Sequence, residues 1–405
     1  MIKLFVTGDN HIGKRYDRYP QAKEKLIKSR IDSIEGMVRE AEYEKCDLFI
    51  VTGDLFDRIN SIKVGDVKRV VDILSSFDGC VLVLPGNHDY YTGEEKVWND
   101  FEKAMDSQDH NITILKEFKP YTFELGDERV IVYPSYCQSK HSKENNLAWI
   151  KDEEIPLDNS YKIGVAHGAI SGVTPDLNNE YFLMTETELL SIPVDVWLIG
   201  HTHIQYPILS QKDTVTGYRI FNAGTHEQTD LHNSTEGCCF IISIDKSQDS
   251  TRVSAHKYIS GKIRYYDMDI TVKPNSDNSL ADEIQKRVSD IDENSVIRIN
   301  VSGTVKTSEY ENRKAKHIDK VLVNYNPQGL RYSILVTYLE CEQDKFKSFT
   351  DRYRKHIAEY APESYSCIGE PEKVDFDGEF LRCMKMQYEV GGVYFAIYHI
   401  IVRMG

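Results

Sequence analysis

Seven side chains that can bind metal ions follow short apolar segments in this 405-residue sequence. They stand in five short motifs, DNH, GD, GNHD, AHG and GHTH, and each motif comes just after an apolar run. The seven residues are Asp9, His11, Asp54, Asn87, His167, His201 and His203. Oxygen and imidazole ligands without a thiolate suit manganese, iron or zinc better than calcium or magnesium. The sequence therefore predicts a metal centre.

The size of this ligand set favours two metal ions. One ion takes about four to six ligands, whereas this set has seven and Asp54 could bridge two ions. A pair of ions about 3.5–4 Å apart can clamp a phosphate and activate a water molecule as the nucleophile. His88 directly follows Asn87, so its side chain should point elsewhere, where it could stabilise the transition state or protonate the leaving oxygen. This combination predicts hydrolysis of a phosphoester.

Each motif alone has a simpler interpretation. Gly-Asp is a common turn, and a single His167 would more often be a hydrogen-bonded histidine of the core. The argument depends on all five motifs occurring in this order, each after a strand. The other eight histidines lack that context, so we expect surface or packing roles for them, with weak exceptions for His226 and His232.

The spacing of apolar residues predicts the elements that bring these motifs together. Short apolar strands at 2–7, 48–51 and 81–84 alternate with helical patterns at 21–45 and 64–77, which indicates a parallel, buried sheet. The carboxyl ends of parallel strands meet at one edge, so residues just beyond them should converge. Later strands are expected at 163–166, 194–199, 218–221 and 239–244, and could form a second sheet. The predicted fold class is α/β, a two-sheet β-sandwich flanked by helices, with a smaller α+β capping domain.

The pattern changes near residue 270, which predicts two domains, 1–268 and 269–405. In the second, residues 280–292 and 343–360 are expected to be helical, and 296–301 and 331–339 to be strands. Residues 388–402 are typical of a hairpin that turns at Gly391-Gly392. This part is the expected capping and C-terminal domain.

Composition limits the partners and the compartment. The net charge is −15, of which about −13 belongs to residues 1–270, and bulk acidity disfavours nucleic-acid binding. Basic runs at 14–18 and 313–316 could be local binding patches or solvated surface. The eight cysteines include no CxxC pair, no apolar stretch is long enough to span a membrane, and the first residues resemble a core strand rather than a signal peptide. We expect a cytoplasmic protein without a membrane segment.

The ordered motifs resemble the calcineurin-like metallophosphoesterase superfamily. Residues 9–13 (DNHIG) and 53–58 (GDLFDR) are similar to the SbcD-type DNA repair nucleases, the bacterial relatives of the meiotic-recombination nuclease. The resemblance covers roughly residues 1–265. It implies a first metal held by Asp9, His11, Asp54 and His203, a second held by Asp54, Asn87, His167 and His201, and His88 as the catalytic histidine.

The resemblance also implies an activity and partners. Proteins of this family prefer manganese, act in double-strand-break repair as 3′–5′ exonucleases on duplex DNA ends, and also cut single strands as endonucleases. They form a homodimer bound to an SbcC/Rad-type coiled-coil ATPase. In this chain the apolar helical faces at 27–41 or 64–77 could form the dimer contact or simply pack on the sheet. The acidic charge and the tail after residue 341 depart from the family pattern.

Two other functions stay open at this point. One is a metallophosphodiesterase acting on a small or non-DNA phosphoester, because similar metal sites serve many substrates. The other is a non-catalytic scaffold, and the complete ligand set with His88 argues against it.

Overall fold

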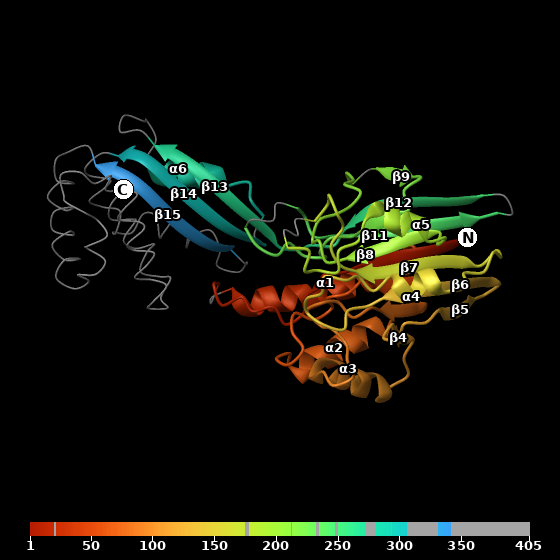
Figure 1. Cartoon of the computed structure of the whole chain (residues 1–405). Coiled ribbons are helices and arrows are strands. Elements are labelled where there is room, and N and C mark those ends of the chain that lie inside the picture. The colour runs from red at the N-terminus through yellow and green to blue at the C-terminus, as the bar shows by residue number, and fades with distance from the viewer. Residues whose placement is uncertain are drawn as a thin grey trace. The chain divides into compact units, whose positions relative to one another are not determined.

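The computed structural model describes residues 1–19, 22–174, 178–211, 213–231, 235–247, 250–272, 280–292, 294–305 and 331–341. The chain divides into two compact units, Met1–Ile263 and Arg264–Gly405, whose elements are labelled in Figure 1. None of the described helices is both long and apolar enough to cross a bilayer.

The first sheet contains seven strands, four of them parallel. The strand order is β4-β3-β2-β1-β11-β12-β9. The parallel strands are β1 (Ile2–Thr7), β2 (Leu48–Val51), β3 (Cys80–Val83) and β4 (Ile112–Ile114). The antiparallel strands are β11 (Cys238–Lys246), β12 (Thr251–Ile259) and β9 (Thr214–Thr216).

The second sheet contains five strands in the order β10-β8-β7-β6-β5. Its parallel strands are β10 (Ile220–Asn222), β8 (Val196–Gly200), β7 (Tyr161–His167) and β6 (Glu128–Ser135), and β5 (Tyr121–Leu125) is antiparallel. Side chains alternate between the two faces of each strand. In β1, Leu4 and Val6 therefore enter the core shared with β6, β7 and β8, while Phe5 enters the core beneath the helices.

Helices cover the outer faces of the two sheets (Figure 1). The helices α1 (Lys23–Tyr43), α2 (Val64–Leu74) and α3 (Lys96–Asp106) contribute to the core of the first sheet. The helices α4 (Ala148–Asp152) and α5 (Glu186–Ser191) pack on the second sheet. The apolar faces predicted at 27–41 and 64–77 bury Ile31, Ile34 and Val71 in the core, so both faces pack on the sheet.

The predicted α/β two-sheet fold is confirmed, with one correction. Residues 239–244 were expected among the strands of the second sheet, but β11 belongs to the first, where Ile241 lies opposite Phe5 of β1. The physical reason is that β11 is buried on both faces. Cys239 and Ile241 pack in the core beneath the helices, and Phe240 and Ile242 pack between the sheets, which suits an interior position beside β1.

The described part of the second unit is a three-stranded sheet with one helix. Strands β13 (Arg264–Val272), β14 (Ser295–Val305) and β15 (Arg331–Cys341) are parallel, and α6 (Leu280–Val288) connects the first two. The helix expected at 280–292 and the strands expected at 296–301 and 331–339 are present. The helix expected at 343–360, the hairpin at 388–402 and the basic run at 313–316 lie outside the described residues.

Candidate metal centre

The seven predicted ligands lie just after strands of both sheets. Three loops of the first sheet, after β1, β2 and β3, carry Asp9, His11, Asp54 and Asn87; the ends of β7 and β8 in the second sheet carry His167, His201 and His203. Backbone hydrogen bonds join the loops after β1 and β2: the Asp9 N–H donates to the Gly53 carbonyl (3.0 Å), and the His11 N–H donates to the Asp54 carbonyl (2.9 Å). The site therefore sits where the two sheets meet at their carboxyl ends.

The backbone of these loops adopts a conformation that most residues avoid. Five of the seven predicted ligands have positive φ angles, between 45° and 101°, and they are Asp9, His11, Asp54, His201 and His203. A left-handed conformation costs a non-glycine residue roughly 1–2 kcal/mol. Such strain tends to collect at functional sites, and here it aims side chains from separate strands at a common point.

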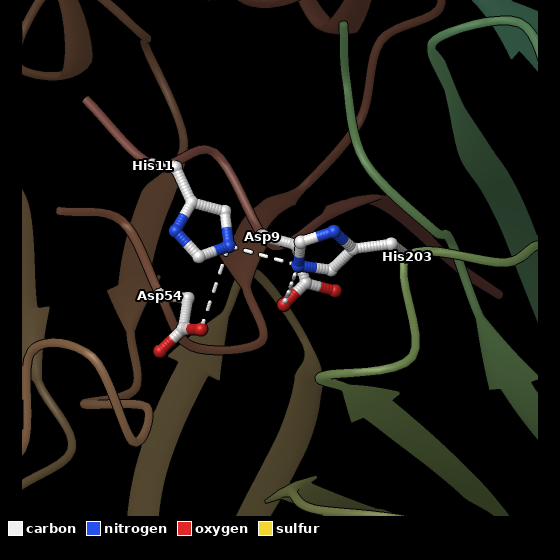
Figure 2. A group of neighbouring side chains, drawn as sticks. All are labelled: Asp9, His11, Asp54 and His203. Carbon is white, nitrogen blue, oxygen red and sulfur yellow. Dashed lines mark hydrogen bonds and ion pairs between the residues drawn. The ribbon is translucent and has the colours of Figure 1, made fainter. Parts of the chain in front are cut away.

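The first predicted ligand group is tightly gathered (Figure 2). One ligand atom from each of Asp9, His11, Asp54 and His203 lies within 4.8 Å of all the others. The Nε2 atoms of the two histidines are 2.8 Å apart. The His11 Nε2 is 3.6 Å from Asp54 Oδ2, and the His203 Nε2 is 3.7 Å from Asp9 Oδ1. Four donor atoms of the expected kinds thus face one small space.

The second predicted group is connected to the first through Asp54. Its Oδ1 is 3.4 Å from the His167 Nε2, while its Oδ2 faces His11. The amide oxygen of Asn87 lies 3.0 Å from both the His167 Nε2 and the His201 Nδ1. Asp54 therefore presents one oxygen to each group, the arrangement that a bridging carboxylate requires.

Burial and the two carboxylates determine the charges of these groups. Burial raises the pKa of Asp9 to about 7, and the nearby Asp54 carboxylate adds to this effect. Burial would also raise the pKa of Asp54, but His167 and His11 hold it well below its usual range. For His167, burial opposes the charge, yet the Asp54 and Asp9 carboxylates raise its pKa to about 9. The site therefore holds an ionised Asp54 beside an imidazole that attracts a proton.

The other three histidines of the set are held neutral. Burial lowers the pKa of His201 to about 4 and also lowers the pKa values of His11 and His203. A neutral imidazole presents the lone pair that a metal requires. Two Nε2 atoms facing each other at 2.8 Å beside two carboxylates form a donor set that a divalent cation would satisfy. The residues present therefore fit divalent metal ions, with Asp9, His11, Asp54 and His203 on one side and Asp54, Asn87, His167 and His201 on the other.

His88 lies at the mouth of this cluster. Its backbone N–H donates to Asp54 Oδ1 at 2.8 Å, and its Nδ1 is 3.2 Å from the Asp57 carbonyl oxygen. Its ring meets the ring of His11 edge-on, with centroids 4.9 Å apart. An N–H at Nδ1 that donates to this carbonyl leaves the lone pair on Nε2. The ring therefore keeps Nε2 available for proton exchange, and one of its nitrogens lies within 4.8 Å of ligand atoms of His11 and Asp57.

Three residues that support the predicted ligands or their loops received no role from the sequence. The Asp57 Oδ1 is 3.3 Å from the His11 Nδ1, and the Thr52 carbonyl is 2.9 Å from the His167 Nδ1. Each fixes a ring so that its Nε2 faces the centre. Asp89 accepts from the Gly86 and Phe56 N–H groups at 2.7 and 2.9 Å, which shapes the turn that carries Asn87. Asp57 lies in the GDLFDR segment and Asp89 in the GNHD motif, so these motifs pointed to both residues without assigning them a role.

Arg30 supports the first loop from beneath. It is only 2% exposed, although it lies on helix α1. Its Nε donates to the Asn10 carbonyl at 2.9 Å, and Nη2 donates to the Asp9 carbonyl at 3.4 Å and the Thr225 hydroxyl at 3.3 Å. The sequence signal was a charged residue on the otherwise apolar face that includes Ile27 and Ile34. Arg30 therefore ties the loop that carries Asp9 and His11 to the helix layer.

Other histidines were expected to have surface or packing roles. His226 is fully buried, its Nε2 lies 2.9 Å from the Arg30 carbonyl oxygen, and burial lowers its pKa well below the usual range. It is a packing residue behind the site rather than a member of it. His232 lies outside the described residues.

Comparisons with known proteins identify a family for this chain. The family model for calcineurin-like phosphoesterases matches residues 2–205, half of the chain. The calcineurin-like phosphoesterase YfkN from Bacillus subtilis has 13% identity and a TM-score of 0.38, and the match covers 64% of this chain and 90% of that one. A dimetal phosphatase from Danio rerio has 11% identity and a TM-score of 0.33, with 62% and 98% covered. The family match, together with the cluster of Asp and His side chains, supports metal-dependent phosphoester hydrolysis. This chain belongs to the calcineurin-like phosphoesterase family.

Proposed function

We propose that this protein is a metal-dependent DNA nuclease of the SbcD type, which acts on duplex ends and single strands during double-strand-break repair. The observation that carries the proposal is the complete set of seven donors with His88 beside them. Within the superfamily, the SbcD-like segments at 9–13 and 53–58 favour the nuclease. Asp57 and Arg58 of the second segment lie in the same cavity as His88, next to the place where a scissile phosphate would bind.

Each of these residues has a separate role in phosphodiester hydrolysis. When bound, two divalent ions supply the Lewis acid that polarises the phosphate and lowers the pKa of a water nucleophile. Asp54 presents one oxygen to each ligand group, which sets their spacing. Asp57 and the Thr52 carbonyl hold His11 and His167 in the required orientation. His88 stands outside the predicted donor set, and with a proton on Nε2 as well as on Nδ1 it would donate a hydrogen bond, and then the Nε2 proton, to the oxygen that leaves.

The resemblance also supports proposals about the metal and the partners. We propose manganese as the working metal, a homodimer as the working assembly, an SbcC/Rad-type coiled-coil ATPase as its partner and the cytoplasm as its location. The apolar faces of α1 and α2 are buried in the core of the first sheet, so a dimer contact would have to use other surfaces of these helices.

The test compares three substrates: an end-labelled duplex, a labelled single strand and a small chromogenic phosphodiester. Each is incubated with Mn²⁺ or with a chelator, using wild type, His88→Ala and the control His110→Ala, which alters an exposed histidine. We expect Mn²⁺-dependent DNA cleavage that falls by roughly 10²–10⁴-fold in His88→Ala and persists in His110→Ala, while metal binding is retained in both. Turnover of the small ester with intact DNA would overturn the nuclease proposal and favour a phosphodiesterase for a smaller substrate.

A further inference from the structure

A cationic cavity lies beside the metal centre. It has a volume of about 480 Å³, and His88 forms part of its wall. Of the described residues that line it, four are cations and one is a carboxylate. The lining residues are Lys14, Arg15, Asp57, Arg58, His88 and Lys140. The metal centre accounts for His88 and Asp57, but it gives no role to the four cations.

The charge of this cavity is the reverse of the charge of the surrounding protein. Residues 1–270 carry about −13 overall, yet the side chains of this cavity carry a net positive charge. Its one carboxylate, Asp57, is already 3.3 Å from both the His11 Nδ1 and the Arg58 Nε. A cluster of like charges is unfavourable by itself, so its position beside a phosphoesterase centre calls for an anionic ligand.

Three separate segments supply the cations. Lys14 and Arg15 follow the loop that carries Asp9 and His11, and Arg58 follows the loop that carries Asp54. Lys140 belongs to a third segment, which touches the site because its carbonyl accepts a hydrogen bond from the Asn87 side chain at 3.3 Å. Each cation-bearing segment is thus anchored to a predicted ligand or to the loop that carries one. If one phosphate of a nucleotide chain bound at the metal centre, the next phosphate along the chain would lie beside the cations of this cavity.

We propose that this cavity is a subsite for a second phosphate of the substrate, the one next to the scissile phosphate along a nucleotide chain. This inference rests on the proposed nuclease function and deepens it. Lys14, Arg15, Arg58 and Lys140 neutralise the flanking phosphate, and the guanidinium groups of Arg15 and Arg58 can bind it through two parallel hydrogen bonds. The site then selects substrates with at least two neighbouring phosphates over an isolated phosphoester. Pairing of these cations with one phosphate explains how a chain with a net charge of −15 would bind a polyanionic substrate.

The experiment uses pairs of chromogenic substrates that differ by one phosphate. One pair is the p-nitrophenyl ester of thymidine 5′-phosphate with and without a 3′-phosphate; the other is the p-nitrophenyl ester of thymidine 3′-phosphate with and without a 5′-phosphate. The readout is the ratio of kcat/KM within each pair, measured with Mn²⁺ for wild type, Arg15→Gln/Lys140→Gln and Arg39→Gln/Lys68→Gln. The last variant removes two charges from exposed helical positions, where Arg39 and Lys68 are paired with Glu35 and Asp72.

We expect wild type to prefer the substrate with two phosphates in at least one pair. The Arg15→Gln/Lys140→Gln variant, which removes two cations of the cavity, should reduce that ratio by on the order of tenfold. Added salt should reduce the ratio in wild type as well. The Arg39→Gln/Lys68→Gln variant should keep the ratio. A wild-type enzyme with no preference in either pair, or a preference that survives in Arg15→Gln/Lys140→Gln, would overturn the subsite. Failure of wild type to cut nucleotide esters or DNA at all would instead overturn the proposed function.

Discussion

Replacing Arg30 by methionine tests whether a buried cation in the helix layer holds the metal-binding loop in place. The change keeps much of the side-chain volume and removes every hydrogen bond of the guanidinium. The Nε bond to the Asn10 carbonyl is short, at 2.9 Å, whereas the bonds to Asp9, Tyr16 and Thr225 are 3.3–3.4 Å long. One charged hydrogen bond contributes about 1.5–3 kcal/mol and weaker ones contribute less, so we expect a loss of about 3–4 kcal/mol in the free energy of unfolding.

That loss should be visible as a thermal shift. For a unit of this size, 1 kcal/mol corresponds to roughly 2–4 °C, so the midpoint of unfolding in chelator should fall by roughly 6–16 °C. The control is Arg39→Met on the same helix, whose side chain is 70% exposed and paired with Glu35. A surface change of that kind should alter the free energy of unfolding by less than about 0.5 kcal/mol.

A second measurement separates a positioning role from a purely structural one. Because Arg30 supports the loop that carries Asp9 and His11, the affinity for Mn²⁺ should fall by about 10–100-fold, as is typical when support for a ligand is lost. Arg30→Lys keeps the charge without the planar fork, so it should retain more stability than Arg30→Met but still bind metal more weakly than wild type. The reasoning fails if Arg30→Met unfolds at the wild-type midpoint, or if it loses stability while its metal affinity stays unchanged.

Two further predictions concern His167. In Gly53→Ala the new Cβ would lie 2.1 Å from the His167 Nδ1 at a φ of 104°, whereas in Gly93→Ala it meets open space at a φ of 100°. The free energy of unfolding should fall by about 1 kcal/mol in both variants because of backbone strain. Only Gly53→Ala should also lose metal affinity, by tenfold or more, as measured by titration. Equal metal affinity in the two variants would rule out the clash. The pKa of His167 is raised to about 9 without metal, so in the folded protein this side chain keeps a proton that it loses above pH ~6.5 in the unfolded chain. The contribution of protonated His167 to stability is therefore complete below pH ~6.5 and is lost as the pH rises through about 9. Metal must displace this proton, so calorimetric titration near pH ~8 in two buffers of different ionisation enthalpy should show proton release; identical heats in both buffers would contradict the prediction.

The strands and the ligand loops were predictable from the sequence because their signals are local. An apolar run that ends at a glycine and a polar ligand indicates a strand and the turn that follows it, and Ile2–Thr7 with Asp9 is an example. The parallel order of β1, β2 and β3 follows from the helices between them. The placement of β11 was wrong because sheet membership depends on which face of a strand meets which layer, and a strand buried on both faces carries no signal that separates the two sheets.

The support of the site was harder to predict because it depends on residues that are distant in sequence. The partners of Arg30 include Thr225, which lies 195 positions away, and the contact exists because the segment after β10 packs against α1, as the bonds of Glu227 and His226 to that helix show. A lone arginine on an apolar helical face indicates that its guanidinium has buried polar partners, but the sequence does not identify those partners. Lys140 is a similar case, since its proximity to Asn87 comes from a loop that follows β6 of the second sheet.

Under the proposed nuclease function, the order of the loops explains how the catalytic part of an acidic chain would act on a polyanion. The carboxylates of Asp9 and Asp54 lie inside a ligand set that divalent ions would neutralise, and the cations of the neighbouring cavity lie on continuations of the same loops. Negative charge elsewhere on the protein repels DNA at long range, but this repulsion is screened over about 10 Å at ordinary ionic strength. Short-range contacts to two adjacent phosphates are screened less. Association should therefore depend on the local geometry of Asp54, His88 and Lys140, rather than on the net charge of −15.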